Sequence, residues 1–98
     1  MTATEFILLM AGKDNDPDWG QFVADWHDNA VAYIRQLGPN HDWRTGQLLM
    51  NALHNVRPDL YHYATATSFD PFYRDGTLYE FGERIYERYV QQFFDTCS

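Results

Sequence analysis

Residues 17–39 read PDWGQFVADWHDNAVAYIRQLGP, and this stretch decides the fold class. Its apolar side chains recur every three or four positions, so they fall on one face of a helix: Trp19, Phe22, Val23, Trp26, Ala30, Tyr33, Ile34 and Leu37. Asp16 can cap that helix with Pro17 in its first position, and Gly38-Pro39 ends it. The stretch predicts one long amphipathic helix.

The segment before it allows two structures. Thr2-Ala3-Thr4-Glu5 is a capping box that can start a short helix at Ala3, which Gly12 would close. The run from Phe6 to Met10 shows no polar face, however, and a buried strand has that pattern too. We favour the helix and keep the strand as the alternative.

The segment after it predicts a second helix, capped by Asp42. Its inner stripe holds Trp43, Met50 and Leu53, with Leu49 beside them. This helix must stop near Arg57, because the residue before a proline disfavours helical geometry. Residues 59–66 can add one or two turns, and residues 68–76 contain the turn signals Asp-Pro and Asp-Gly.

A capping box at Thr77 opens the last helix. One face is apolar, and the other carries alternating charges at Glu80, Glu83, Arg84, Glu87 and Arg88. Apolar helical faces joined by short linkers predict a mainly α fold: a small single-domain bundle of three to five helices spanning residues 1–98.

Composition narrows the class of partner. The 98 residues carry 14 acidic and 7 basic side chains, for a net charge of −7. A negative field repels phosphate backbones, so we expect no direct nucleic-acid binding, but an acidic surface can meet a basic groove on another protein. The apolar run from Phe6 to Ala11 is too short to cross a membrane. The single cysteine, Cys97, favours a reducing compartment, and we expect a cytoplasmic protein.

Metal and catalytic sites are weakly indicated. Asp14, Asp16, Asp18 and Asp25 have the spacing of an EF-hand calcium loop, but Trp19 stands where that loop needs glycine and Pro17 stiffens it. We interpret the stretch as a solvated acidic turn and expect no cofactor. No two histidines lie three or four positions apart, and Pro58 separates the last two: His27, His41, His54 and His62.

A polar stripe and an aromatic loop form the most specific pattern. Arg44, Gln47, Asn51 and His54 share one side of the second helix, and the loop contains Phe69, Asp70, Pro71, Phe72, Tyr73, Arg74 and Asp75. In the structural interpretation, Gln47 and Asn51 bond the loop backbone and Arg44 pairs with Asp70 or Asp75. Gly46 would let the loop or another helix cross closely. The alternative is a partner-binding surface made of Arg44, Gln47, Asn51, Asp70, Phe72, Tyr73 and Asp75.

Residues 43–81 resemble a group of short phage and prophage proteins. The resemblance rests on Arg44-Thr45-Gly46-Gln47, Asn51-Ala52-Leu53, Pro58 and the loop from Asp70 to Asp75. In this comparison, residues 1–40 look like an N-terminal addition that packs on a core of residues 41–96. The resemblance implies a phage origin rather than a reaction.

These observations lead to a functional expectation with two alternatives. We expect a non-catalytic phage-type interaction protein, an acidic inhibitor that binds a host or defence protein in the host cytoplasm. The first alternative is a small hydrolytic or metal-dependent enzyme that uses calcium or zinc. The second is a self-assembling structural component of a phage, for which a homo-oligomer would be needed.

Overall fold

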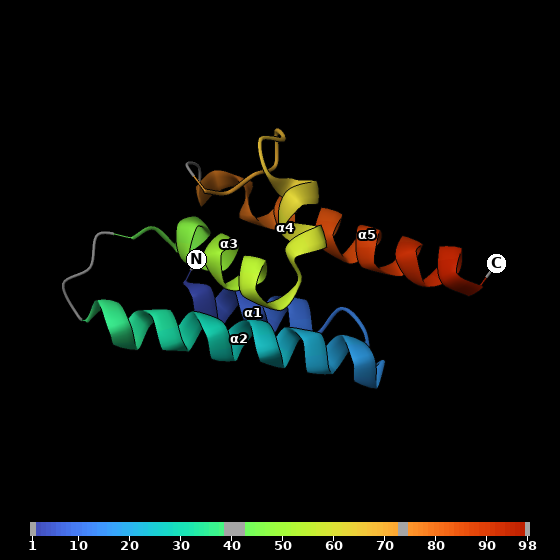
Figure 1. Ribbon diagram of the computed structural model, residues 1–98, viewed down its shortest axis with the longest axis horizontal. Coiled ribbons are helices and arrows are strands. Elements are labelled where there is room, and N and C mark those ends of the chain that lie inside the picture. Colours follow the sequence, from blue (N-terminus) through green and yellow to red (C-terminus); the bar gives the residue numbers. More distant parts are fainter. Residues whose placement is uncertain (1, 39–42, 73–74, 98) are drawn as a thin grey trace.

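The computed structural model describes residues 2–38, 43–72 and 75–97, with the side chains of all of these except Asp75 and residues 93–97. This part of the chain is helical and contains no strand (Figure 1). The elements follow in the order α1 (Ala3–Ala11), α2 (Pro17–Leu37), α3 (Thr45–Val56), α4 (Pro58–Ala64), the 3₁₀ turn η1 (Asp75–Thr77) and α5 (Leu78–Cys97). The predicted small, mainly α bundle is confirmed.

The N-terminal segment is a helix, so the strand alternative is wrong. The Thr2 hydroxyl accepts the Glu5 backbone N–H at 3.1 Å, as an N-cap does. Phe6 and Met10 are buried, whereas Leu8 is 67% exposed. The sequence of this helix shows no polar face because an apolar residue, Leu8, occupies its solvent-exposed side.

The long helix α2 begins and ends as predicted. The Asp16 carboxylate accepts the Asp18 N–H at 2.7 Å, and Gly38 leaves the helix with φ of +80°. The apolar face is buried from Trp19 to Ala30, but Ile34 is 38% exposed. Figure 1 shows why: the C-terminal end of α2 extends beyond the other helices.

The second predicted helix begins later than expected. α3 starts at Thr45, with the extended residue Arg44 in the N-cap position. Trp43 therefore lies outside the helix, and the prediction that placed it on the inner stripe is wrong. Its ring packs at 5.6 Å from the ring of Tyr33 and covers α2 instead. Asp42, the predicted cap, lies outside the described residues.

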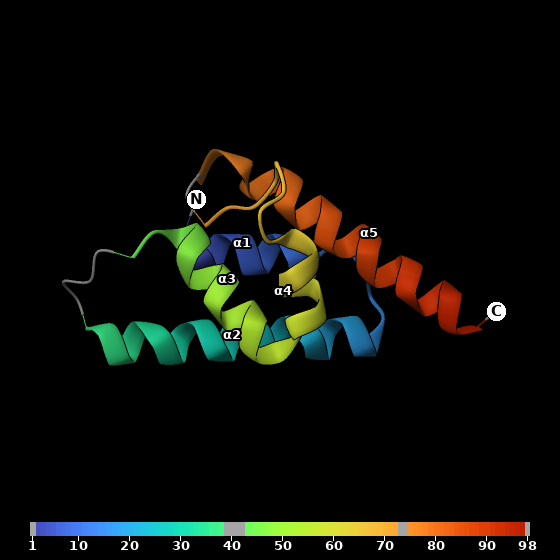
Figure 2. The same ribbon diagram turned by 45° about the horizontal axis from the view of Figure 1, so that its top comes forward.

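The helices surround one core. α1 lies between α2 and α5, and α3 and α4 close one side (Figures 1 and 2). The Phe6 ring packs at 5.3 Å from Trp26 of α2 and at 5.6 Å from Phe81 of α5. A single cluster of buried side chains includes members of all five helices: Phe6, Met10, Trp19, Trp26, Leu49, Leu53, Leu60, Phe81 and Ile85.

Two buried indoles fix α2 against its neighbours. The indole N–H of Trp19 donates to the Met10 carbonyl of α1 at 2.8 Å, and that of Trp26 donates to the Leu49 carbonyl of α3 at 2.9 Å. A buried tryptophan needs such a partner for its single donor. The two bonds set the position of α2 along both helices, and hence which side of α2 faces outward.

Candidate interaction surfaces

The aromatic loop crosses the first turn of α3 at Gly46. A β-carbon added to Gly46 would lie 1.9 Å from the Pro71 carbonyl oxygen, so only glycine fits there. Pro71 is fully buried, and Phe69 is 9% exposed. The prediction that Gly46 permits a close approach of this loop is confirmed.

Asp70 organises its own loop. One carboxylate oxygen accepts the Ala66 N–H at 2.9 Å, and the other accepts the Phe72 N–H at 2.9 Å. Ala66 has φ of +63°, a left-handed conformation that costs a non-glycine residue about 1–2 kcal/mol. The carboxylate stabilises this turn by holding the Ala66 N–H. Asp70 therefore acts within the loop. The sequence suggested that Arg44 pairs with Asp70 or Asp75, and the Asp75 side chain lies outside the described residues.

Within the polar stripe, the Asn51 side chain bonds its own helix. The Asn51 amide donates to the Gln47 carbonyl of its own helix at 3.0 Å, so it does not use that donor on the loop backbone. Gln47 and Asn51 are half-buried and Arg44 is exposed. Tyr73 and the Asp75 side chain lie outside the described residues. Asp70 and the contact of Pro71 with Gly46 both help to hold the loop.

A small hollow remains between α3, α4 and the loop. It has a volume of about 140 Å³ and is lined by Met50, Tyr61, Thr65, Asp70 and Phe72. Phe72 is only half-buried. The predicted binding residues Asp70 and Phe72 therefore do contribute to a surface depression, in addition to their place in the loop.

The acidic turn before α2 docks onto α5. The Tyr86 hydroxyl donates to one Asp14 oxygen at 2.8 Å, and the Asp16 N–H donates to the other at 3.0 Å. These bonds, that of Tyr86 first, hold the pKa of Asp14 below its usual range. Lys13 beside it pairs with Glu83 of α5. The turn therefore links the start of α2 to α5.

The carboxylates of the calcium-like pattern do not share a common partner: Asp14 accepts from Tyr86 of α5, and Asp18 takes part through its backbone N–H. Asp16 caps α2, and Asp25 accepts the Gln21 side-chain amide at 2.9 Å. Within the part of the chain that the structure describes, no three His, Cys, Asp or Glu side chains lie together as metal ligands would. The spacing in the sequence thus does not become a shared site in space.

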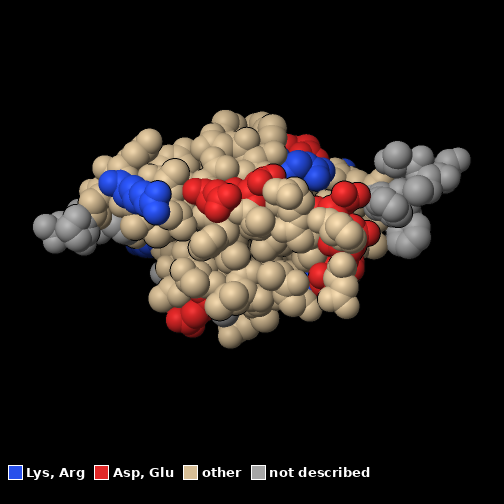
Figure 3. Space-filling view, turned by 90° about the horizontal axis from the view of Figure 1, so that it is seen from below, with Lys and Arg blue, Asp and Glu red and all other residues tan. Residues whose placement is uncertain are grey.

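The outward side of α2 carries a row of carboxylates. Asp18, Asp25 and Asp28 are seven and three positions apart, which places them on one side of the helix. Asp18 and Asp28 are exposed and Asp25 is half-buried. Figure 3 views the molecule from this side, and acidic side chains gather on it. We call these three residues the acidic row.

Folding brings two histidines together that the sequence kept apart. The ring centres of His54 on α3 and His62 on α4 are 6.1 Å apart. Tyr61 packs against both, at 4.6 Å from His54 and 5.3 Å from His62. Pro58 lies between the two helices, and the angle at which α4 leaves α3 brings the rings together. His27 lies apart on α2, and His41 lies outside the described residues.

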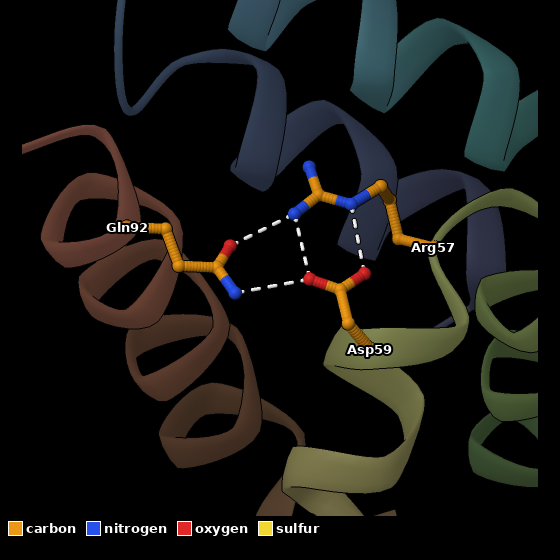
Figure 4. A network of polar contacts seen from close by, with 3 residues as sticks. All are labelled: Arg57, Asp59 and Gln92. Atoms are coloured by element: carbon orange, nitrogen blue, oxygen red, sulfur yellow. Dashed lines mark hydrogen bonds and ion pairs between the residues drawn. The ribbon is translucent and has the colours of Figure 1, made fainter. Parts of the chain in front are cut away.

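An unpredicted network fixes the turn between those helices (Figure 4). Arg57 donates two hydrogen bonds to Asp59, at 2.9 and 2.8 Å, and a third to Gln92 of α5 at 2.8 Å. Gln92 donates back to Asp59 at 3.0 Å. The Asp59 carboxylate raises the pKa of Arg57, and the Arg57 guanidinium in turn holds the pKa of Asp59 well below its usual range.

Comparisons with protein-family models, with curated proteins and with solved structures yield no match for this chain. Across the described residues, none of the helices is both long and apolar enough to span a bilayer. Inference about function therefore starts from the surfaces themselves.

Proposed function

We propose that this protein is a non-catalytic interaction protein whose acidic row on α2 binds a basic surface of a protein partner. The observation that carries the proposal is the exposure of these carboxylates on the outer side of a helix whose inner side is locked into the core. In the described part of the chain, Asp18, Asp25 and Asp28 form no ion pair with Lys or Arg. Their charge is available to a partner.

The core holds the helix that carries these charges in a fixed position. Trp19 and Trp26 hold the inner side of α2 through buried hydrogen bonds, and Phe22 stacks on Trp26 at 5.5 Å. A binding group that is already fixed in place loses less conformational entropy on association. A rigid row of carboxylates also speeds encounter with a positively charged partner.

The resemblance to phage proteins suggests that the partner is a protein of the host cell. A small acidic phage protein acts most simply by covering a basic functional surface of a host or defence protein. The net charge of −7 supports such a role, because a protein that binds anionic ligands has a positively charged surface that attracts a negative one. We place this action in the host cytoplasm.

Affinity capture from host lysate tests the proposal. The purified chain, immobilised through its C-terminus, should retain a stoichiometric protein with a basic surface. Raising the salt from about 0.1 to 1 M should release it, since screening weakens charge pairing. Recovery of no stoichiometric partner would contradict the proposal, and light scattering of the protein alone reveals self-assembly if that is its function instead.

A further inference from the structure

The pair of histidines at the α3–α4 turn is not used by the proposed function. Both side chains are exposed, and they come from two consecutive helices. Neutral imidazole is a ligand for zinc, nickel and copper ions. The first question is whether two rings so placed can reach one ion.

The separation of the rings meets this requirement. A metal–nitrogen bond of about 2.0–2.1 Å, added to about 1.2 Å from the nitrogen to the ring centre, puts each centre about 3.2 Å from the ion. Two rings on one ion can therefore be at most about 6.4 Å apart, and about 5.2 Å at a tetrahedral angle. The observed 6.1 Å lies inside the limit. Rotation of exposed side chains supplies the remaining adjustment.

The backbone beneath the pair is held in place. His54 lies three residues before Arg57, and His62 lies three residues after Asp59. The hydrogen bonds between Arg57, Asp59 and Gln92 fix the turn that joins the two helices. The Arg57 guanidinium also lies 5.8 Å from the rings of Phe22 and Tyr89, which anchors it to α2 and α5. Two ligands on a fixed turn lose little entropy when they chelate an ion.

We propose that His54 and His62 together bind one divalent transition-metal ion of the zinc, nickel or copper class. No third His, Cys, Asp or Glu within the described residues completes the site. The described part of the chain therefore supplies two ligands, and water completes the site. Such a site is open and holds the metal with moderate affinity, in contrast to a closed structural site with four protein ligands.

Calorimetric titration of the untagged protein with Ni²⁺ and Zn²⁺ at pH 7.5 tests this proposal. We expect one equivalent of metal to bind with a dissociation constant in the micromolar range. His54→Ala and His62→Ala should each weaken binding at least tenfold, because each removes half of the chelate. Circular dichroism should show that both variants keep the helical fold, since both side chains are exposed.

His27→Ala is the matched control, because it removes a histidine of α2 that lies apart from the pair. Its affinity should equal that of the wild type. The proposal is overturned if the wild type shows no binding at millimolar metal. It is also overturned if His54→Ala and His62→Ala bind as tightly as His27→Ala.

Discussion

Gly46 and Gly20 both lie in helices, but only Gly46 has a neighbour where a side chain would be. The Pro71 carbonyl fills that space at Gly46, whereas nothing lies within 4 Å of the corresponding point at Gly20. Gly46→Ala should therefore destabilise the protein by about 1–3 kcal/mol through overpacking. Gly20→Ala should stabilise it by about 0.4–1 kcal/mol, because alanine favours the helix.

Urea denaturation of the two alanine variants measures this contrast. The shifts in unfolding free energy should have opposite signs. Shifts of the same sign would mean that the loop does not cross α3 at Gly46.

Asp70 and Asn51 differ in the bonds that they provide. Asp70→Ala removes the acceptor of two backbone N–H groups and should cost about 1–3 kcal/mol. Asn51→Ala removes one bond within its own helix and should cost about 0.5 kcal/mol or less. Thermal melts of the two variants give the ranking. A larger loss for Asn51→Ala would restore the role in anchoring the loop that the sequence suggested.

At the scale of the elements, the Arg57–Asp59–Gln92 network that links α3, α4 and α5 predicts that stability depends on pH. Arg57 first, and then Gln92, hold the pKa of Asp59 below its usual range. A lowered pKa in the folded state stabilises the fold above the ordinary aspartate pKa of about 3.9, and this contribution is lost as the pH falls below it. Because 46% of the Asp59 side chain is exposed, solvent screening keeps the effect to about 1 kcal/mol or less.

Melting temperatures from pH 7 to pH 2 check this prediction. Asp59→Asn should lower stability at pH 7 and flatten its decline below pH 4. Asp28→Asn serves as the control, because Asp28 makes no ion pair within the described residues. Equal pH profiles for Asp59→Asn and the wild type would show that the network adds nothing in solution.

Most helices could be predicted from local signals, and the wrong predictions concern residues placed by tertiary contacts. Capping residues and Pro17 gave the start of α1 and α2, because these effects act within one turn. Trp43 was misplaced because its apolar ring suits a helix face and a covering loop equally well. Arg88 was expected on the polar face of α5, but it is half-buried and its guanidinium lies 5.3 Å from the Tyr63 ring of α4. The spacing of apolar residues shows which face of a helix is buried. Tertiary contacts determine which side chains pack along the border of that face.

At the scale of the whole molecule, the candidate surfaces were the least predictable. The Gly46 contact could be foreseen, because a helical glycine requires a reason. The His54–His62 pair and the Arg57–Asp59–Gln92 network could not, since they depend on the angle at which α4 leaves α3. The acidic row needed the orientation of α2, which the buried bonds of Trp19 and Trp26 determine.

The central claim is that a partner binds the acidic row, and charge-matched variants test it most directly. One variant carries Asp18→Asn, Asp25→Asn and Asp28→Asn. The other carries Glu5→Gln, Glu80→Gln and Glu87→Gln, which are exposed on α1 and α5. Each removes three negative charges from the net charge of −7, so long-range attraction falls equally.

The measurement is the dissociation constant of the captured partner for the wild type and both variants, by calorimetry at two salt concentrations. We predict that the α2 variant binds at least tenfold more weakly and with a smaller salt dependence, because direct charge contacts are lost. The other variant should stay within about threefold of the wild type. Equal weakening of both variants, or wild-type affinity in the α2 variant, would contradict the account.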